Sequence, residues 1–121
     1  GQNIVEFALV VPMLLLLVFG IAEFGRAWMT RNILTGAARE AVRIAVVPAG
    51  TIGTATARAN QVLASSGITT ATVSFIDDGI SFGTITATVS YNFPVVVVGF
   101  IPGLNRMQIP LTSTTTMRKE F

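Results

Sequence analysis

The chain has 121 residues, enough for one domain, and its eight basic and six acidic side chains leave a net charge of +2. Only 12% of the residues are charged and 51% are hydrophobic, whereas ordinary soluble domains carry roughly 25% charged residues, so this chain is expected to cover surface with lipid or other chains. The sequence has no basic run of the kind that binds nucleic acid, and it has no cysteine or histidine, which excludes disulfides, thiolate chemistry and the commonest zinc sites.

The most apolar part of the chain is a stretch of 16 uncharged residues from Phe7 to Ala22. Counted from Ile4 it forms about 28 Å of helix, close to the roughly 30 Å hydrocarbon core of a bilayer. It predicts a membrane-spanning helix rather than a cleaved signal peptide, because the helical pattern continues past Ala22. A buried core helix is the other interpretation, but so small a chain has little material to surround one. Pro12 lacks an amide hydrogen and predicts a kink or a local loss of helix there.

Glu6 stands at the N-terminal edge of this apolar stretch. A carboxylate in such a position is costly unless a cation neutralises it, and the α-amino group of a neighbouring copy would supply that cation. Glu6 therefore predicts a subunit that waits in a membrane and then assembles through its N-terminal helix. In the alternative interpretation, Glu6 is an interfacial residue stabilised by the helix dipole. Phe19, Phe24 and Trp28 are predicted to pack between helices of neighbouring subunits.

The helix is predicted to continue to about Val47, where the Val47-Pro48-Ala49-Gly50 segment ends it. One stripe of small or aliphatic residues recurs at helical spacing along its second half: Leu34, Ala37, Ala38, Ala41 and Ala45. Small side chains on one stripe permit a sheet or another helix to approach closely. A shorter amphipathic helix is expected over residues 51–66.

After the second helix the hydrophobic period changes to two, which predicts strands over about 70–75, 80–91 and Met107–Arg118. Asp77-Asp78-Gly79 predicts a hairpin turn between the first two strands. A calcium site at these two acidic residues is the less favoured interpretation, since no further acidic residue is near in the sequence. The apolar phase of the second strand slips at Gly83-Thr84, which predicts a β-bulge there.

An apolar loop, Phe93 to Leu104, separates the last two predicted strands. Exposed to water, it would form an apolar patch larger than monomers usually carry. We therefore expect Val97 and Phe100 to be buried against a neighbouring subunit or under the head of their own chain.

These elements predict an α+β fold in which a long protruding N-terminal α-helix packs on a small antiparallel sheet of about three strands, as in type IV pilin-like subunits. Residues 1–47 are the expected transmembrane and assembly helix, and residues 48–121 the globular head with a short helix and the antiparallel β-sheet. No catalytic, cofactor-binding or metal-binding residues are predicted, because no arrangement typical of an enzyme occurs.

The segment GQNIVEFALVVPMLLLLVFGIAEFGRAW, followed by LTGAAREAVRIAV, resembles the N-terminal domain of TadE-like proteins, the pilin-like components of tight-adherence (Tad/Flp) systems. The resemblance implies processing by a prepilin peptidase near Gly1, with Phe7 in the recognised sequence. Gln2 would then be the first mature residue and Glu6 the fifth, whereas a cut before Gly1 gives the other register. It also implies that the Glu6 carboxylate pairs with a neighbour's N-terminus.

The resulting hypothesis is a structural subunit that polymerises into an extracellular Tad or type IV-like pilus for adhesion. Its partners would be other copies of the chain in a helical filament, the prepilin peptidase, the Tad or type IV assembly machinery and, before assembly, the cytoplasmic membrane, with no nucleic acid. Two alternatives remain open: a single-pass membrane accessory protein that never polymerises, and a minor pseudopilin that primes the filament.

Overall fold

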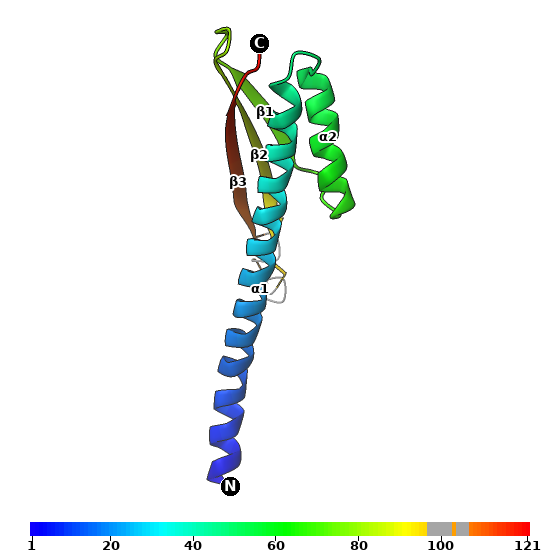
Figure 1. Cartoon of the computed structure of the whole chain (residues 1–121). Coiled ribbons are helices and arrows are strands. Elements are labelled where there is room, and N and C mark those ends of the chain that lie inside the picture. The colour runs from blue at the N-terminus through cyan, green and yellow to red at the C-terminus, as the bar shows by residue number, and fades with distance from the viewer. Residues whose placement is uncertain (97–102, 104–106) are drawn as a thin grey trace.

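A computed structural model of the chain describes residues 1–96, 103 and 107–121. The elements in order are two helices, α1 (Gln2–Ala45) and α2 (Ile52–Ser65), and three strands, β1 (Thr72–Asp77), β2 (Thr84–Pro94) and β3 (Gln108–Arg118). The strands form one antiparallel sheet in the order β1-β2-β3. The C-terminal half of α1 packs on this sheet beside α2, while its N-terminal half projects alone (Figure 1). The predicted α+β, pilin-like arrangement is confirmed.

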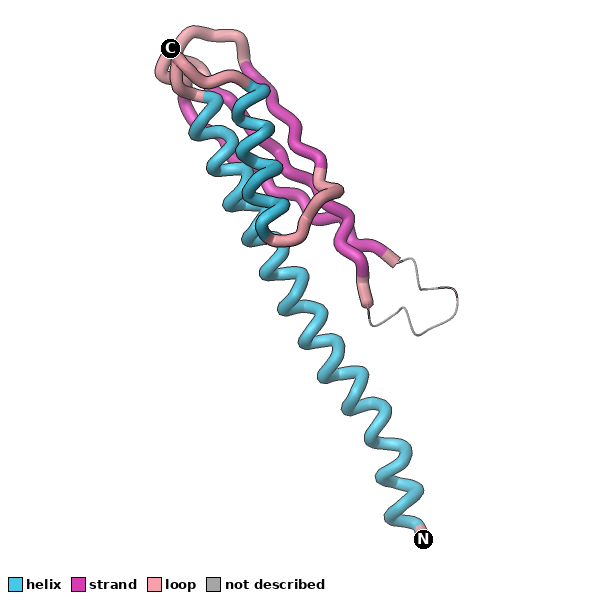
Figure 2. The backbone as a smooth tube through the Cα atoms, turned by 90° about the vertical axis from the view of Figure 1, so that its right-hand side faces the viewer, coloured by secondary structure: helices cyan, strands magenta, loops and turns pink. Residues whose placement is uncertain are grey.

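Helix α1 has 44 residues and is therefore about 66 Å long. It continues without interruption through Pro12, and Figure 2 shows it as one rod from the N-terminus into the head. Local loss of helix at Pro12 is not observed, and a kink there stays a prediction. The helix ends at Ala45, where the amide of Val46 still donates to the carbonyl of Val42 at 3.0 Å.

The stripe predicted on the second half of α1 is the centre of the core. All five predicted members, Leu34, Ala37, Ala38, Ala41 and Ala45, are buried, and Val42, which the prediction did not include, is buried with them. Ala41 and Val42 pack with Ala55 and Ala59 of α2 and with the β2 side chains of Ile85 and Ala87. Because alanine is small, the helices and the sheet approach closely along the whole stripe.

Helix α2 begins at the residue that its sequence marks as a cap. The side chain of Thr51 accepts a hydrogen bond from the amide of Thr54 at 3.1 Å, and the Thr54 hydroxyl accepts from the amide of Thr51 at 3.0 Å. This reciprocal pair satisfies amides that would otherwise lack partners at the helix start. Arg58 of α2 also pairs with Glu40 of α1 at 3.3 Å, which adds a polar link between the two helices.

The register of the sheet corrects two sequence expectations. Strand β2 begins at Thr84, and residues 78–83 form the turn, so the β-bulge predicted at Gly83-Thr84 is wrong. The apparent slip in the apolar phase arose because Ile80 and Phe82 belong to this turn, where Phe82 has a φ of 57°. At its other end β2 includes Phe93 and Pro94, which the sequence had assigned to the apolar loop.

The sheet has one apolar and one hydroxyl-bearing face. Ile85, Ala87, Val89 and Phe93 of β2 are buried under the helices. On the outer face the threonine hydroxyls of neighbouring strands meet, Thr86 with Thr116 at 2.8 Å and Thr88 with Thr114 at 3.4 Å. This alternation is typical of an antiparallel sheet that is covered on one side only.

Candidate functional site

The N-terminal half of α1 is a bare apolar helix. From Gly1 to Ala22 every residue is exposed except Val11, which is half-buried. Thirteen large apolar side chains between Ile4 and Ile21 have 48–73% of their surface exposed. They include four consecutive leucines, residues 14–17, so apolar side chains project from all sides of the helix. A helix of this kind requires an apolar environment all round rather than a single docking face.

The predicted processing and assembly residues lie together at the N-terminal end of this helix. Gly1 is the N-cap, without a side-chain capping bond, and Gln2 is the first helical residue. Glu6 and Phe7 follow within the first two turns, and both are exposed, Phe7 to 71%. Among the described residues, none of the ion pairs of the chain involves Glu6. Their roles in processing and assembly stay predictions.

The aromatic residues predicted to pack between subunits follow α1 toward the head. Phe19 is 49% exposed. Phe24 and Trp28 are 70% and 57% exposed and stack on each other, with ring centroids 6.3 Å apart. All three therefore present surface that another chain or a lipid can cover. Val97 and Phe100, the other two residues predicted to pack between subunits, lie outside the described residues.

A polar junction marks the level at which α1 enters the head. Arg26 donates to Glu23 at 2.7 Å, and its guanidinium lies 4.9 Å from the centre of the Phe93 ring of β2. The Glu23 side chain is only 15% exposed. Within the part of the chain that the structure describes, its second carboxylate oxygen is buried and accepts no hydrogen bond. Arg26 thus joins the start of the head to the C-terminal edge of the apolar stretch.

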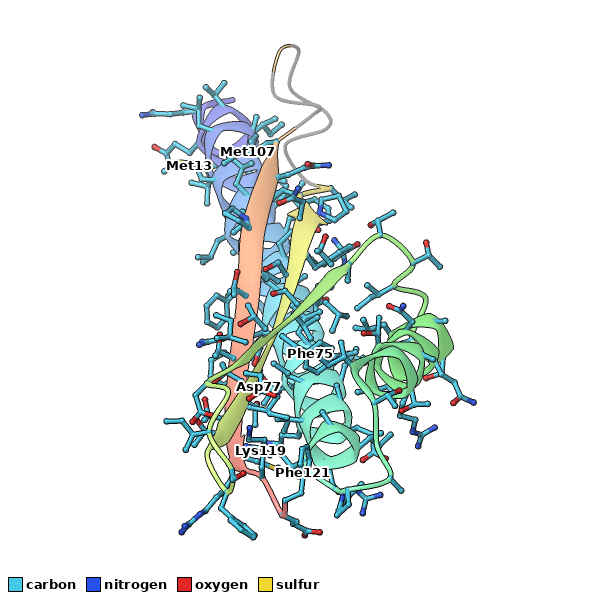
Figure 3. All side chains as sticks on the ribbon, turned by 90° about the horizontal axis from the view of Figure 1, so that it is seen from above. Met13, Phe75, Asp77, Met107, Lys119 and Phe121 are labelled. Carbon is cyan, nitrogen blue, oxygen red and sulfur yellow. The ribbon has the colours of Figure 1, made fainter. Side chains whose placement is uncertain are left out.

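The opposite pole of the head contains a charged cluster that sequence reasoning missed. Lys119 has a side chain that is 5% exposed, and its ammonium donates to Asp77 at 2.7 Å and lies 3.6 Å from Asp78 (Figure 3). Asp77 and Asp78 also accept from the amides of Gly79 and Thr84 at 2.9 and 2.7 Å. The turn predicted at these residues is confirmed, and its carboxylates hold a buried lysine.

The hydrogen bonds of this cluster set its electrostatics. The bond from Lys119 is the main cause that lowers the pKa of Asp77, followed by the bond from the Gly79 amide. The amides of Thr84 and Ile80 lower the pKa of Asp78, and the bond to Asp77 raises the pKa of Lys119. The burial of Lys119 had one signal in the sequence, the alternation of β3. This alternation continues through Met117 and places residue 119 on the inner face of the sheet.

Backbone hydrogen bonds around the charged cluster close this pole of the head. The amides of Lys119 and Glu120 donate to the carbonyls of Gly83 and Val46 at 2.7 and 2.8 Å, and the amide of Phe82 donates to the carbonyl of Phe121 at 2.7 Å. The last residues of the chain thereby join the β1–β2 turn to the end of α1. In the described ranges, no three His, Cys, Asp or Glu side chains gather closely enough to hold a metal ion.

The geometry defines a class of protein: an α+β, pilin-like protein with a bare apolar helix. Among the described residues, α1 is the one helix whose length and composition are sufficient to cross a membrane. Residues 1–43 match the model of a family described as TadE-like protein, which confirms the resemblance found in the N-terminal segment. Searches of curated proteins and of solved structures find no match.

The family match covers α1 almost completely and stops before α2 and the sheet. Combined with the apolar helix, it indicates a pilin-like protein associated with Tad pili. TadE-like, pilin-like proteins are generally structural rather than enzymatic, and they are associated with the Tad assembly machinery. The N-terminal helix is consistent with anchoring in a membrane.

Proposed function

We propose that this chain is a structural pilin-like subunit that α1 holds in the cytoplasmic membrane and that polymerises through α1 into an extracellular Tad-type filament for surface attachment. The observation that carries the proposal is the bare, all-round apolar half of α1. Thirteen large apolar side chains facing water would cost on the order of 20 kcal/mol, more than the 5–15 kcal/mol by which a domain is typically stable. This helix half therefore needs an apolar environment in every state of the protein.

Two environments meet this need in succession. Before assembly, residues 4–22 fit the hydrocarbon core of a bilayer in length. After assembly, a bundle of the same helices would surround each copy with apolar side chains, with the heads outside. Residues 1 to about 28 would form this bundle. Transfer from lipid to bundle keeps the apolar side chains covered, so it avoids the cost of exposing them to water.

The Glu6 carboxylate would be stabilised differently in the membrane and in the bundle. In the bilayer it lies at the interfacial end of the helix, where water and headgroups solvate the carboxylate. In a bundle of apolar helices it would be stable only next to a cation, and the N-terminal amine of an adjacent copy is the proposed partner. This amine becomes available through cleavage by a prepilin peptidase near Gly1 or Gln2, which is part of the same proposal.

Replacing Glu6 tests the proposal directly. We expect Glu6→Ala to leave the protein in the membrane fraction and to reduce filaments recovered by mechanical shearing by at least about tenfold, which corresponds to the loss of a pairing worth about 1.4 kcal/mol or more per subunit. Asn3→Ala, which removes another exposed polar side chain of the same turns, should retain filaments. Parental filament yield from Glu6→Ala would refute assembly through this carboxylate. Absence of filaments from the unmodified protein would favour the non-polymerising accessory protein.

A further inference from the structure

The described ends of β2 and β3, called the hairpin end, carry exposed apolar side chains that the assembly proposal does not use, and they lie beside Phe24 and Trp28 of α1, which the proposed bundle includes. On the hairpin, Val96, Met107 and Ile109 are 53%, 46% and 41% exposed. On α1, Phe24 and Trp28 face a hollow that Ala27, Arg31 and Leu111 of β3 complete. Figure 3 shows Met107 at the end of β3 opposite Lys119. The cluster therefore lies at the pole of the head that is nearer to the apolar stretch.

The strand lengths place this hairpin end level with the edge of the apolar stretch. At the far pole, Glu120 is bonded to Val46 of α1, and at the near pole Phe93 lies against Arg26. The strand ladder continues at least one pair beyond Phe93 and Pro94, because the amide of Val95 donates to the carbonyl of Met107 at 3.2 Å. Two further strand residues advance about 7 Å, or four to five residues of helix, which reaches the level of Ala22.

The hairpin end stands beside α1 rather than on it, as Figure 2 shows for the ends of β2 and β3. A surface that is level with Ala22 and to one side of the helix coincides with the membrane surface when residues 4–22 span the hydrocarbon core. Phe24 and Trp28 then occupy the interfacial zone, where aromatic side chains are enriched. Arg31 follows on the same helix and is exposed, so it can contact lipid phosphates, whereas Arg26 is bonded to Glu23 at 2.7 Å.

We infer that the head has a second membrane contact: the hairpin end, with Val96, Met107 and Ile109, inserts shallowly into the lipid headgroup layer beside the α1 anchor. The inference rests on the membrane stage of the proposed function. It concerns the subunit before assembly and fixes the head against the bilayer. Its partner is a phospholipid surface, since the cluster is continuous with the membrane-spanning segment and the carboxylate nearest to it along α1, Glu23, is largely buried and paired with Arg26.

Spin labels test the inference, because the chain has no cysteine of its own. The full chain is reconstituted in phosphatidylcholine–phosphatidylglycerol vesicles with one cysteine, at Met107, Thr112, Ile80 or Leu14. For each label we compare the ratio of its collisions with oxygen to its collisions with a water-soluble nickel chelate. We expect this ratio to be at least about threefold higher for the Met107 label than for the labels at Thr112 and Ile80. Thr112 is the matched control, because it is an exposed residue of β3 farther from the proposed contact. Ile80 is an exposed apolar residue at the far pole.

The label at Leu14 separates failure of the inference from failure of the anchor. If Leu14 is deep in lipid and Met107 is as accessible to nickel as Thr112, the hairpin contact is wrong and the anchor stands. If Leu14 is itself accessible to nickel, the membrane stage fails and the inference fails with it. Protection of Met107 that disappears when the protein is diluted in lipid would assign the surface to a second copy of the chain and would also overturn the inference.

The single tryptophan, Trp28 of α1, gives an independent readout of the depth of the anchor beside this contact. Trp28 emission should shift to shorter wavelength in vesicles and be quenched by lipids brominated near the headgroup more than by lipids brominated at the chain ends. Ile109→Asp should return the Met107 label to water without moving the Leu14 label, whereas Ile80→Asp should change neither. Retention of the lipid signal at Met107 in Ile109→Asp would contradict the assigned surface.

Discussion

The two halves of α1 share one continuous helix but have opposite surroundings. From Gly1 to Ala22 large apolar side chains project on every side and remain exposed. From Leu34 to Ala45 one stripe of mostly small side chains is completely covered, while Arg39 and Arg43 on other faces are exposed. A stripe of small residues creates close contact with one sheet, whereas bulky residues all round require an apolar medium. The position of the apolar side chains around the helix, rather than their number, distinguishes the half that packs on the sheet from the half that needs an apolar medium.

The same truncation in each half provides the sharpest test of this contrast. Leu34→Ala removes a side chain with no exposed surface, and we expect the head to lose about 2–5 kcal/mol of unfolding free energy. Leu16→Ala, at a residue that is 58% exposed, should leave the stability of the head unchanged. Urea unfolding in detergent, monitored through the hydrogen exchange of β2 amides, measures the stability of the head in both variants. Equal losses from the two variants would show that the bare half also supports the head.

Two glycines, one within α1 and one in the loop after it, test where the chain is closely packed and where it is open. A Cβ at Gly50 would overlap the carbonyl oxygen of Ile44, because the loop after α1 returns across the last turn of the helix. We expect Gly50→Ala to destabilise the head by about 1–3 kcal/mol. A Cβ at Gly36 of α1 meets no other atom within 4 Å, so Gly36→Ala should stabilise the detergent-solubilised subunit by about 0.5–1 kcal/mol. Thermal unfolding compares them, and a neutral Gly50→Ala would contradict the close approach.

The charged cluster at the far pole predicts how the head depends on pH. The folded-state pKa values of Asp77 and Asp78 lie below their ordinary value of 3.8, so their contribution is present above that value and is lost as the pH falls through the folded-state pKa values. Lys119 has a pKa above its ordinary value of 10.5, so its contribution is present below 10.5 and is lost as the pH rises through the folded-state pKa.

The variant Lys119→Met isolates this effect from the other carboxylates of the chain. We expect the difference in unfolding free energy between parent and variant to be constant from about pH 5 to 9 and to shrink below pH 3.8. This is the smallest of the predicted effects, since Asp77 and Asp78 are partly exposed and water screens them. A difference that does not change down to pH 2 would show that the ion pairs add nothing to the stability of the head.

Local patterns in the sequence predicted those parts of the fold in which neighbours along the chain decide the structure. The helical stripe containing Ala38 and Ala41 was identified by its spacing. The Asp77-Asp78-Gly79 signal predicted the turn correctly because these carboxylates bond to amides close to them in sequence, those of Gly79 and Ile80. The β-bulge was predicted wrongly because alternation alone does not reveal that Ile80 and Phe82 stand in a turn before the strand begins.

Contacts between distant residues could not be predicted in this way. The hydroxyl of Ser113 meets that of Thr35 at 2.7 Å across 78 positions of the chain, and Lys119 is bonded to Asp77 across 42. A lysine side chain is ordinarily exposed. Its burial became evident only when the β2–β3 register placed it on the inner face beside the turn.

The sequence by itself determined the bare helix, because a run of apolar residues without charge needs an apolar environment whatever the rest of the chain does. It also determined the helix stripe and the alternating strands, since the periods of 3.6 and 2 follow from backbone geometry. Only the tertiary structure decided where the head stands along α1, which side chains close its far pole and which apolar residues of the hairpin lie level with Ala22. These depend on strand register and on packing between distant segments, and local periodicity specifies neither.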